Sequence, residues 1–259
     1  MRPGSAGLQA CLAIVLAAGL SAQRGAPPGP PPTPKAGAPV DLTGYWVSLV
    51  TEDWRWRMVT PLKNDSASVP VNPAAKKVMA GWDPAKDEAA GNQCKAYGAA
   101  AIMRMPTRLR ISWQDDNTLK VETDAGTQTR ILHFTGTPAP NQPASWQGYS
   151  AARWDGGLTP AGGLGLGLGP RQGTRSRSLE VVTTNLKPGY LRKNGVPYSS
   201  KTTVTEYFER FSEPDGNDHL MVMTIVTDPE YLAVPYVVTS DFKKEADGSR
   251  WDPSPCSAR

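Results

Sequence analysis

Glu206 is the residue with the strongest potential for acid/base chemistry. It lies in the segment 202–211, where Val204, Glu206, Phe208 and Arg210 occupy alternate positions. In a β-strand these four side chains share one face. A carboxyl group between apolar neighbours is typical of a general acid or base with a raised pKa. Glu206 is therefore a candidate catalytic residue.

Arg130 is a candidate partner for Glu206 and Arg210 in a charged cluster. It lies between Thr129 and Ile131 in another alternating segment. Inside a barrel, its guanidinium would hold an anionic group of a ligand. The same residues also fit an internal ion pair that fixes strand register, or a solvated outer face. The sequence leaves these interpretations open.

His133 is the second candidate for acid/base chemistry. It precedes Phe134 at the end of an expected strand, where it could line the mouth of a barrel, whereas His219 lies in a polar turn. No serine or cysteine nucleophile is tied to either imidazole, so no hydrolytic triad is predicted. The histidines also lack metal-ligand spacing with the cysteines, so we expect no metal site. No motif predicts a cofactor.

Aromatic and basic side chains provide further candidate ligand contacts. We expect the segment 185–199 to be a long polar loop, and such groups on a loop are typical of ligand contact. Any strand connection can carry them as well. Tryptophans of the expected strand 146–154 would line a barrel interior. The candidate ligand-binding residues are Arg130, Trp146, Trp154, Tyr190, Arg192 and Arg210.

The elements that must position these residues are mostly strands. Alternating apolar and polar residues, separated by turn signals, predict a β-meander over 108–134. About eight antiparallel strands indicate an all-β barrel or sandwich. Short turns favour an up-and-down barrel, which leaves no exposed edge. The other expected strands are 41–50, 146–154, 178–186, 202–211, 220–227 and 236–242.

A short helical insertion near 73–91 interrupts the strands. Asn72-Pro73 and Asp83-Pro84 each combine a capping side chain with proline at the first helical position. Gly91 ends the second helix. The sequence therefore predicts two short helices in series.

Several motifs along the chain resemble a group of exported bacterial proteins with a shared layout. The resemblance covers most of the chain, although Tyr149 replaces a serine that is more common in the group, and 156–173 is an insertion. It implies an antiparallel, lipocalin-like barrel, and it brings no activity with it. The matching motifs are Gly44 with Trp46, Cys94–Gly98, 108–134, Trp146–Trp154, Val181–Thr184, Glu206–Phe211 and Asp228–Pro235.

The first residues predict export. Arg2 precedes an apolar run at 10–20 and the small residues Ser21 and Ala22, which is the order of a secretory signal peptide over 1–22. We expect a proline-rich, disordered tether at 23–40, followed by one barrel domain over 41–259. The predicted location is the periplasm or the extracellular space. The Gly-rich segment 156–173 is either a mobile lid or a low-complexity insertion without a role.

Cysteine usage agrees with export. Removing the signal peptide takes Cys11 with it and leaves Cys94 and Cys256. An even number of cysteines in an exported chain favours a disulfide. The alternative is two free, buried thiols.

Net charge and hydropathy exclude two classes of partner. The formal charge is +4, and basic and acidic residues are interspersed, so we expect no nucleic acid partner. No second apolar stretch predicts an integral membrane segment after signal cleavage. The resulting hypothesis is a protein that binds a small, mostly apolar molecule inside its barrel. The alternatives are an enzyme that uses the same cavity for acid/base chemistry, and an envelope protein-interaction module.

Overall fold

The computed structural model describes residues 30–155 and 178–259. The expected signal peptide, residues 23–29 of the expected tether and the Gly-rich segment 156–173 lie outside these residues. Pro32–Arg259 forms one compact unit. None of the described helices is long and apolar enough to cross a membrane.

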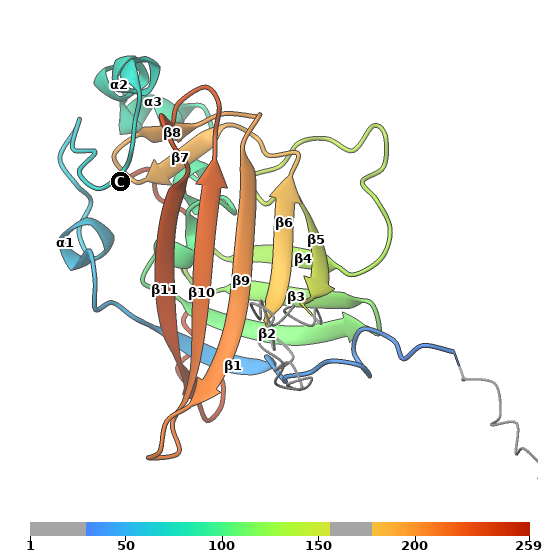
Figure 1. The fold of residues 1–259 in the computed structure, drawn as a ribbon. Helices are drawn as coiled ribbons and strands as arrows, with labels where there is room; N and C mark the ends of the chain where they lie inside the picture. The colour runs from blue at the N-terminus through green and yellow to red at the C-terminus, as the bar shows by residue number, and fades with distance from the viewer. Residues whose placement is uncertain (1–29, 156–177) are drawn as a thin grey trace, which may run out of the picture. The chain divides into compact units, whose positions relative to one another are not determined.

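Nine of the described strands form a closed barrel in the order β1-β11-β10-β9-β6-β5-β4-β3-β2 (Figure 1). This confirms the expected all-β barrel with a small helical insertion. The barrel strands are β1 (Gly44–Leu49), β2 (Arg108–Asp115), β3 (Thr118–Thr123), β4 (Gln128–His133), β5 (Tyr149–Trp154), β6 (Leu179–Thr184), β9 (Thr203–Ser212), β10 (Asp218–Thr227) and β11 (Tyr236–Glu245).

One strand pair departs from the expected antiparallel pattern. Strands β4 and β5 are parallel, with Leu132 opposite Ser150 and His133 opposite Ala151. A parallel pair requires a connection that returns the chain to the end where the first strand began. The segment 134–148 makes that return, so the barrel is not a simple up-and-down meander.

Apolar side chains fill the barrel interior. On β10, Leu220, Val222, Thr224 and Val226 are buried while their neighbours in sequence are at least partly exposed, as the two-residue period of a strand requires. Trp46 is fully buried and donates its indole N–H to the Leu42 carbonyl at 3.0 Å. The largest interior side chains are Trp46, Leu109, Ile111, Leu119, Leu132, Phe208 and Phe242.

Short helices and a hairpin cover one end of the barrel, where β10 ends and β11 begins (Figure 1). We call it the capped end. Two of the helices follow the predicted capping signals: the Asn72 side chain accepts from the Ala75 N–H, and Asp83 accepts from Ala85. The elements of this region are α1 (Trp54–Arg57), α2 (Pro73–Ala80), α3 (Pro84–Ala89), η1 (Lys95–Tyr97), η2 (Ile102–Arg104), β7 (Gly189–Arg192) and β8 (Val196–Tyr198).

The hairpin of β7 and β8 corrects one expectation. The segment 185–199 is not a long polar loop: every residue of β8 is buried, and β7 and β8 pair in antiparallel fashion. The turn between them contains Gly195 with a φ of +83°, a conformation that favours glycine. The sequence did not indicate β7 and β8 because polar residues occupy the turn between them and the segments on either side.

The predicted disulfide is present. Cys94, just before η1, is bonded to Cys256, with the two Cα atoms 5.1 Å apart and a separation of 162 positions in sequence. Closing a loop of this length stabilises a fold by about 5 kcal/mol in the chain-entropy treatment. The bond fastens the C-terminal segment beside the turn between β3 and β4, where the Gly126 carbonyl lies 3.4 Å from the Cys256 sulfur.

Candidate functional site

Arg130 and Glu206 meet inside the barrel. Arg130 Nη1 and Nη2 donate to the two carboxylate oxygens of Glu206 at 2.9 and 2.5 Å, and both side chains are 0% exposed. The pair joins β4 to β9, which are not neighbours in the sheet. Both oxygens of Glu206 are therefore occupied by the guanidinium, the arrangement of an internal ion pair that holds strands in register.

A narrow polar band surrounds this ion pair. Arg130 Nη2 also donates to Thr183 Oγ1 at 3.3 Å, and Thr183 is 2.8 Å from the Ser150 hydroxyl. On the other side, the buried hydroxyls of Thr224 and Ser240 have no hydrogen-bond partner within the described residues. The band crosses an interior that is otherwise lined by apolar core side chains.

The second catalytic candidate lies apart from the first. His133 alternates with the inward-facing Leu132 on β4 and is partly exposed, whereas Leu132 is 0% exposed. Its ring stacks on Tyr149 with the ring centroids 4.7 Å apart. His133 and Glu206 are thus on opposite faces of the barrel wall.

The aromatic ligand-binding candidates are divided between the two ends of the barrel. Trp154 packs against Phe134 and Trp113 at the end opposite the cap, and its indole N–H donates to the Pro34 carbonyl at 2.8 Å. Part of the expected tether thus contacts the barrel. Trp146 lies under the Lys187 ammonium, 4.8 Å from the ring centroid.

Tyr190 and Arg210 have internal partners. The Tyr190 hydroxyl donates to Asp87 at 2.8 Å, and burial together with this carboxylate raises the pKa of Tyr190 above its usual value. Arg210 donates to Asp218 and to the Asp41 carbonyl, both at 2.7 Å. Neither side chain contacts the Arg130–Glu206 pair through a hydrogen bond.

Arg192 lies elsewhere, in a cleft of about 220 Å³ beside the capped end. The wall of the cleft comes from α1 and the residues after it, from η2 and from the β7–β8 hairpin, and we call it the α1–β7 cleft. Its apolar surface is provided by Trp56, Met58, Val59, Tyr97, Met105 and Leu191. Its charged surface is provided by Asp53, Arg57, Arg104, Arg192 and Lys193.

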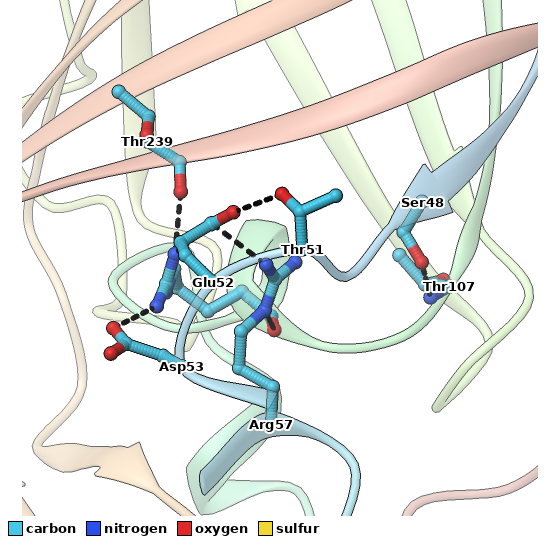
Figure 2. A network of polar contacts seen from close by, with 8 residues as sticks. Ser48, Thr51, Glu52, Asp53, Arg57, Thr107 and Thr239 are labelled. Carbon is cyan, nitrogen blue, oxygen red and sulfur yellow. Dashed lines mark hydrogen bonds and ion pairs between the residues drawn. The ribbon is translucent and has the colours of Figure 1, made fainter. Parts of the chain in front are cut away.

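A polar network holds one side of the α1–β7 cleft. Arg57 donates to Glu52 at 2.9 Å and to the Arg104 carbonyl at 2.8 Å. Arg104 in turn binds Asp53, Glu52 and the Thr239 carbonyl of β11. Figure 2 shows Glu52 near the centre of this network, with Asp53, Arg57 and Thr239 around it. The network therefore fixes α1 to the barrel wall.

Arg57 retains unused hydrogen-bonding capacity. Its side chain is 3% exposed, and its Nη2 atom has no partner within the described residues. Burial, reinforced by the charge of Arg104, lowers the pKa of Arg57. A buried donor without an acceptor costs about 1–3 kcal/mol, and more when the group is charged.

Arg192 forms the opposite side of the cleft. It is 8% exposed, and its Nη1 atom is also without a partner within the described residues. Its guanidinium lies over the Trp56 ring at 5.2 Å, while Arg55 lies 4.9 Å from the same ring. The cleft therefore combines an aromatic surface with two buried guanidinium groups, a combination that binds anionic or polarisable groups.

The sequence singled out Arg192 but not Arg57 or Trp56. The segment 54–59 alternates apolar and basic residues. This is the period of a strand, so the sequence did not indicate the single helical turn of α1. Its N-cap, Asp53, is a residue type that caps helices, but its backbone is left-handed, with a φ of 53°, and its side chain makes no capping hydrogen bond. The proximity of 54–59 to 191–193 is a tertiary contact without a local sequence signal.

Comparisons with known proteins add no relative. No family model, no curated protein and no solved structure matches the chain. The chemistry of the site therefore rests on its own geometry.

Proposed function

We propose that this protein binds a small, mostly apolar molecule in the α1–β7 cleft. The observation that supports the proposal is a cleft that combines apolar and aromatic side chains with buried guanidinium groups. Sites for small molecules are typically concave and apolar, with a few polar groups that orient the ligand.

The cleft is a better location for the ligand than the barrel interior. The interior is occupied by the side chains of Trp46, Phe208, Phe242 and their neighbours. Both oxygens of Glu206 are engaged by Arg130, which also weakens the case for acid/base catalysis at this position. The proposal therefore keeps the small-molecule ligand inferred from the sequence and moves it outside the barrel wall.

The size of the cleft limits the size of the ligand. Its volume of about 220 Å³ is below the ~300–1,000 Å³ common for drug-sized ligands. Met58 and Val59, on the rim, are 57% and 63% exposed. A compact molecule that reaches the cleft from solvent fits these dimensions.

Export is part of the same proposal. The charged, apolar and small residues of 1–22 follow the order of a signal peptide, and the Cys94–Cys256 disulfide suits an oxidising compartment. The resemblance to exported bacterial proteins with lipocalin-like barrels supports a periplasmic or extracellular binding protein.

Native mass spectrometry tests the proposal on protein purified from the exported fraction. A small molecule that co-purifies, and is released on unfolding, is the expected result. The variant Val59→Trp places a large ring in the cleft and should lose the bound mass, whereas the matched control Val237→Trp, at a 55% exposed site outside the cleft, should retain it. Equal retention by both variants would place the ligand elsewhere.

A further inference from the structure

We propose that the ligand of the α1–β7 cleft carries a carboxylate, which Arg192 binds together with Lys193 and Arg57. This inference rests on the proposed function and adds the chemical class of the ligand. It follows from the charges that line the cleft and from which of them lack a counter-charge.

Arg192 is a buried cation without an ion-pair partner. It is 8% exposed, and within the described residues no carboxylate lies within ion-pair distance of it. The nearest acidic influence is Asp65, but that carboxylate accepts hydrogen bonds from Trp56 and from the Ala67 N–H. Buried charges in proteins are normally paired, so the Arg192 guanidinium is suited to an external anion.

Lys193 adds a second positive charge from the same hairpin. It is partly exposed, and its ammonium lies 5.7 Å from the centroid of the Tyr97 ring. The described part of the chain supplies no carboxylate within ion-pair distance of this group either. Two adjacent cations, neither of them within ion-pair distance of a carboxylate among the described residues, therefore line the cleft from β7 and the turn that follows it.

Arg57 faces the same cleft from α1 with a free donor. Its Nε and Nη1 atoms donate to the Arg104 carbonyl and to Glu52, while its buried Nη2 has no acceptor within residues 30–155 and 178–259. Arg192 Nη1 is likewise buried and has no hydrogen-bond acceptor within the described residues. A carboxylate has two oxygens with about four acceptor positions, enough to accept from both guanidinium groups.

The other charges of the cleft favour a single negative charge. Arg104 is already paired with Glu52 and Asp53, and Asp53 itself lines the cleft. A second negative charge on the ligand would approach this carboxylate. The apolar residues Met58, Val59 and Leu191 suit a short hydrocarbon body next to the carboxylate.

Three six-carbon probes distinguish charge from apolar fit: hexanoate, 1-hexanol and hexylammonium. Their binding to the disulfide-bonded protein is measured by ligand-observed NMR at low salt. Hexanoate should bind at least about tenfold more tightly than 1-hexanol, because it gains charge-assisted hydrogen bonds. Hexylammonium should bind more weakly than either, and added salt should reduce only the preference for hexanoate.

Variants test whether the preference for hexanoate depends on Arg192 and Lys193. Arg192→Gln and Lys193→Gln should each reduce the preference for hexanoate over 1-hexanol, measured as the ratio of the two affinities in the same variant. The matched control is Arg153→Gln, whose side chain is 70% exposed and pairs with Glu180 outside the cleft. Thermal unfolding of each variant verifies that it is folded. A loss of preference in Arg153→Gln equal to that in Arg192→Gln would overturn the assignment.

The other outcomes of the probe experiment distinguish a failure of the carboxylate inference from a failure of the proposed function. Equal binding of hexanoate and 1-hexanol would overturn the carboxylate inference and leave the cleft as an apolar binding site. Tightest binding of hexylammonium would do the same. If none of the three probes binds, the cleft is not a ligand site, and the proposed function fails with the inference.

Discussion

Arg130 on β4 and Glu206 on β9 form a two-bonded ion pair across the barrel interior, with both side chains 0% exposed. Burying two charges costs free energy that their attraction only partly returns. The pair therefore contributes more to the choice of strand register than to the overall free energy of folding.

Glu206→Gln should destabilise the protein by about 3–5 kcal/mol, because it leaves the Arg130 charge buried without a counter-charge. Urea unfolding followed by circular dichroism measures the loss. The control is the double variant Arg130→Met with Glu206→Leu, which removes both charges. Its stability should return to within about 2 kcal/mol of the original protein. A Glu206→Gln variant of unchanged stability would contradict this account.

Reduction of the Cys94–Cys256 disulfide should lower the free energy of unfolding by about 5 kcal/mol, since the bond closes a long loop. The double variant Cys94→Ser with Cys256→Ser provides the same loss without a reducing agent. Chemical denaturation of both forms is the measurement. If the double variant is as stable as the oxidised protein, the C-terminal segment is held by its other contacts.

The lowered pKa of the Asp228 carboxyl group predicts a specific dependence of folding stability on pH. Burial alone would raise its pKa, but hydrogen bonds from the Thr202 hydroxyl and from the N–H groups of Ser199, Glu230 and Tyr231 outweigh burial and lower it. A pKa lower in the folded than in the unfolded state gives stability that is fully present above the unfolded value, 3.8, and lost as pH falls through the folded value.

The test compares Asp228→Asn with the original protein from pH 7 to pH 2. At pH 7 the variant should be less stable by about 1–3 kcal/mol. The difference should shrink below about pH 3.8, where the carboxyl group of the original protein becomes protonated. A difference that stays constant down to pH 2 would assign the loss to geometry and not to charge.

Gly195→Ala should destabilise the hairpin that carries Arg192 and Lys193. A Cβ at this position would lie 2.3 Å from the Trp82 ring, and the φ of +83° is unfavourable for alanine. Overpacking and backbone strain together predict a loss of about 2–4 kcal/mol. Thermal unfolding measures it. Gly216→Ala is the matched control: it has a similar φ of +84° but no atom within 4 Å of the added Cβ, so it should lose less.

The local sequence predicted most of the barrel because strand and helix signals are local. Alternation placed Glu206 on the same face of its strand as Val204 and Phe208, and all three side chains are buried. The sequence alone left open whether that face points into the barrel. Asn72 and Asp83 cap their helices as their sequence context indicated. These features depend on neighbours in the chain and on the period of the element.

The α1–β7 cleft escaped prediction because it depends on contacts between distant segments. Arg57 and Arg192 are brought together by the fold, and neither has a neighbour in sequence that indicates the other. The parallel pairing of β4 and β5 is also non-local, since it depends on the path of 134–148. The β7–β8 hairpin was missed because polar residues occupy its turn and its flanks.

Strands β1 and β11 close the barrel, with Tyr45 opposite Glu245, so its seam joins positions about 200 residues apart in the chain. During synthesis β1 can pair with β2 early, but its other edge has no partner until the ribosome has produced β11. Unpaired strand edges are templates for association with other chains. A nascent or truncated chain that ends before β11 therefore exposes edges on both β1 and β10, and it is the form of this protein most open to aggregation.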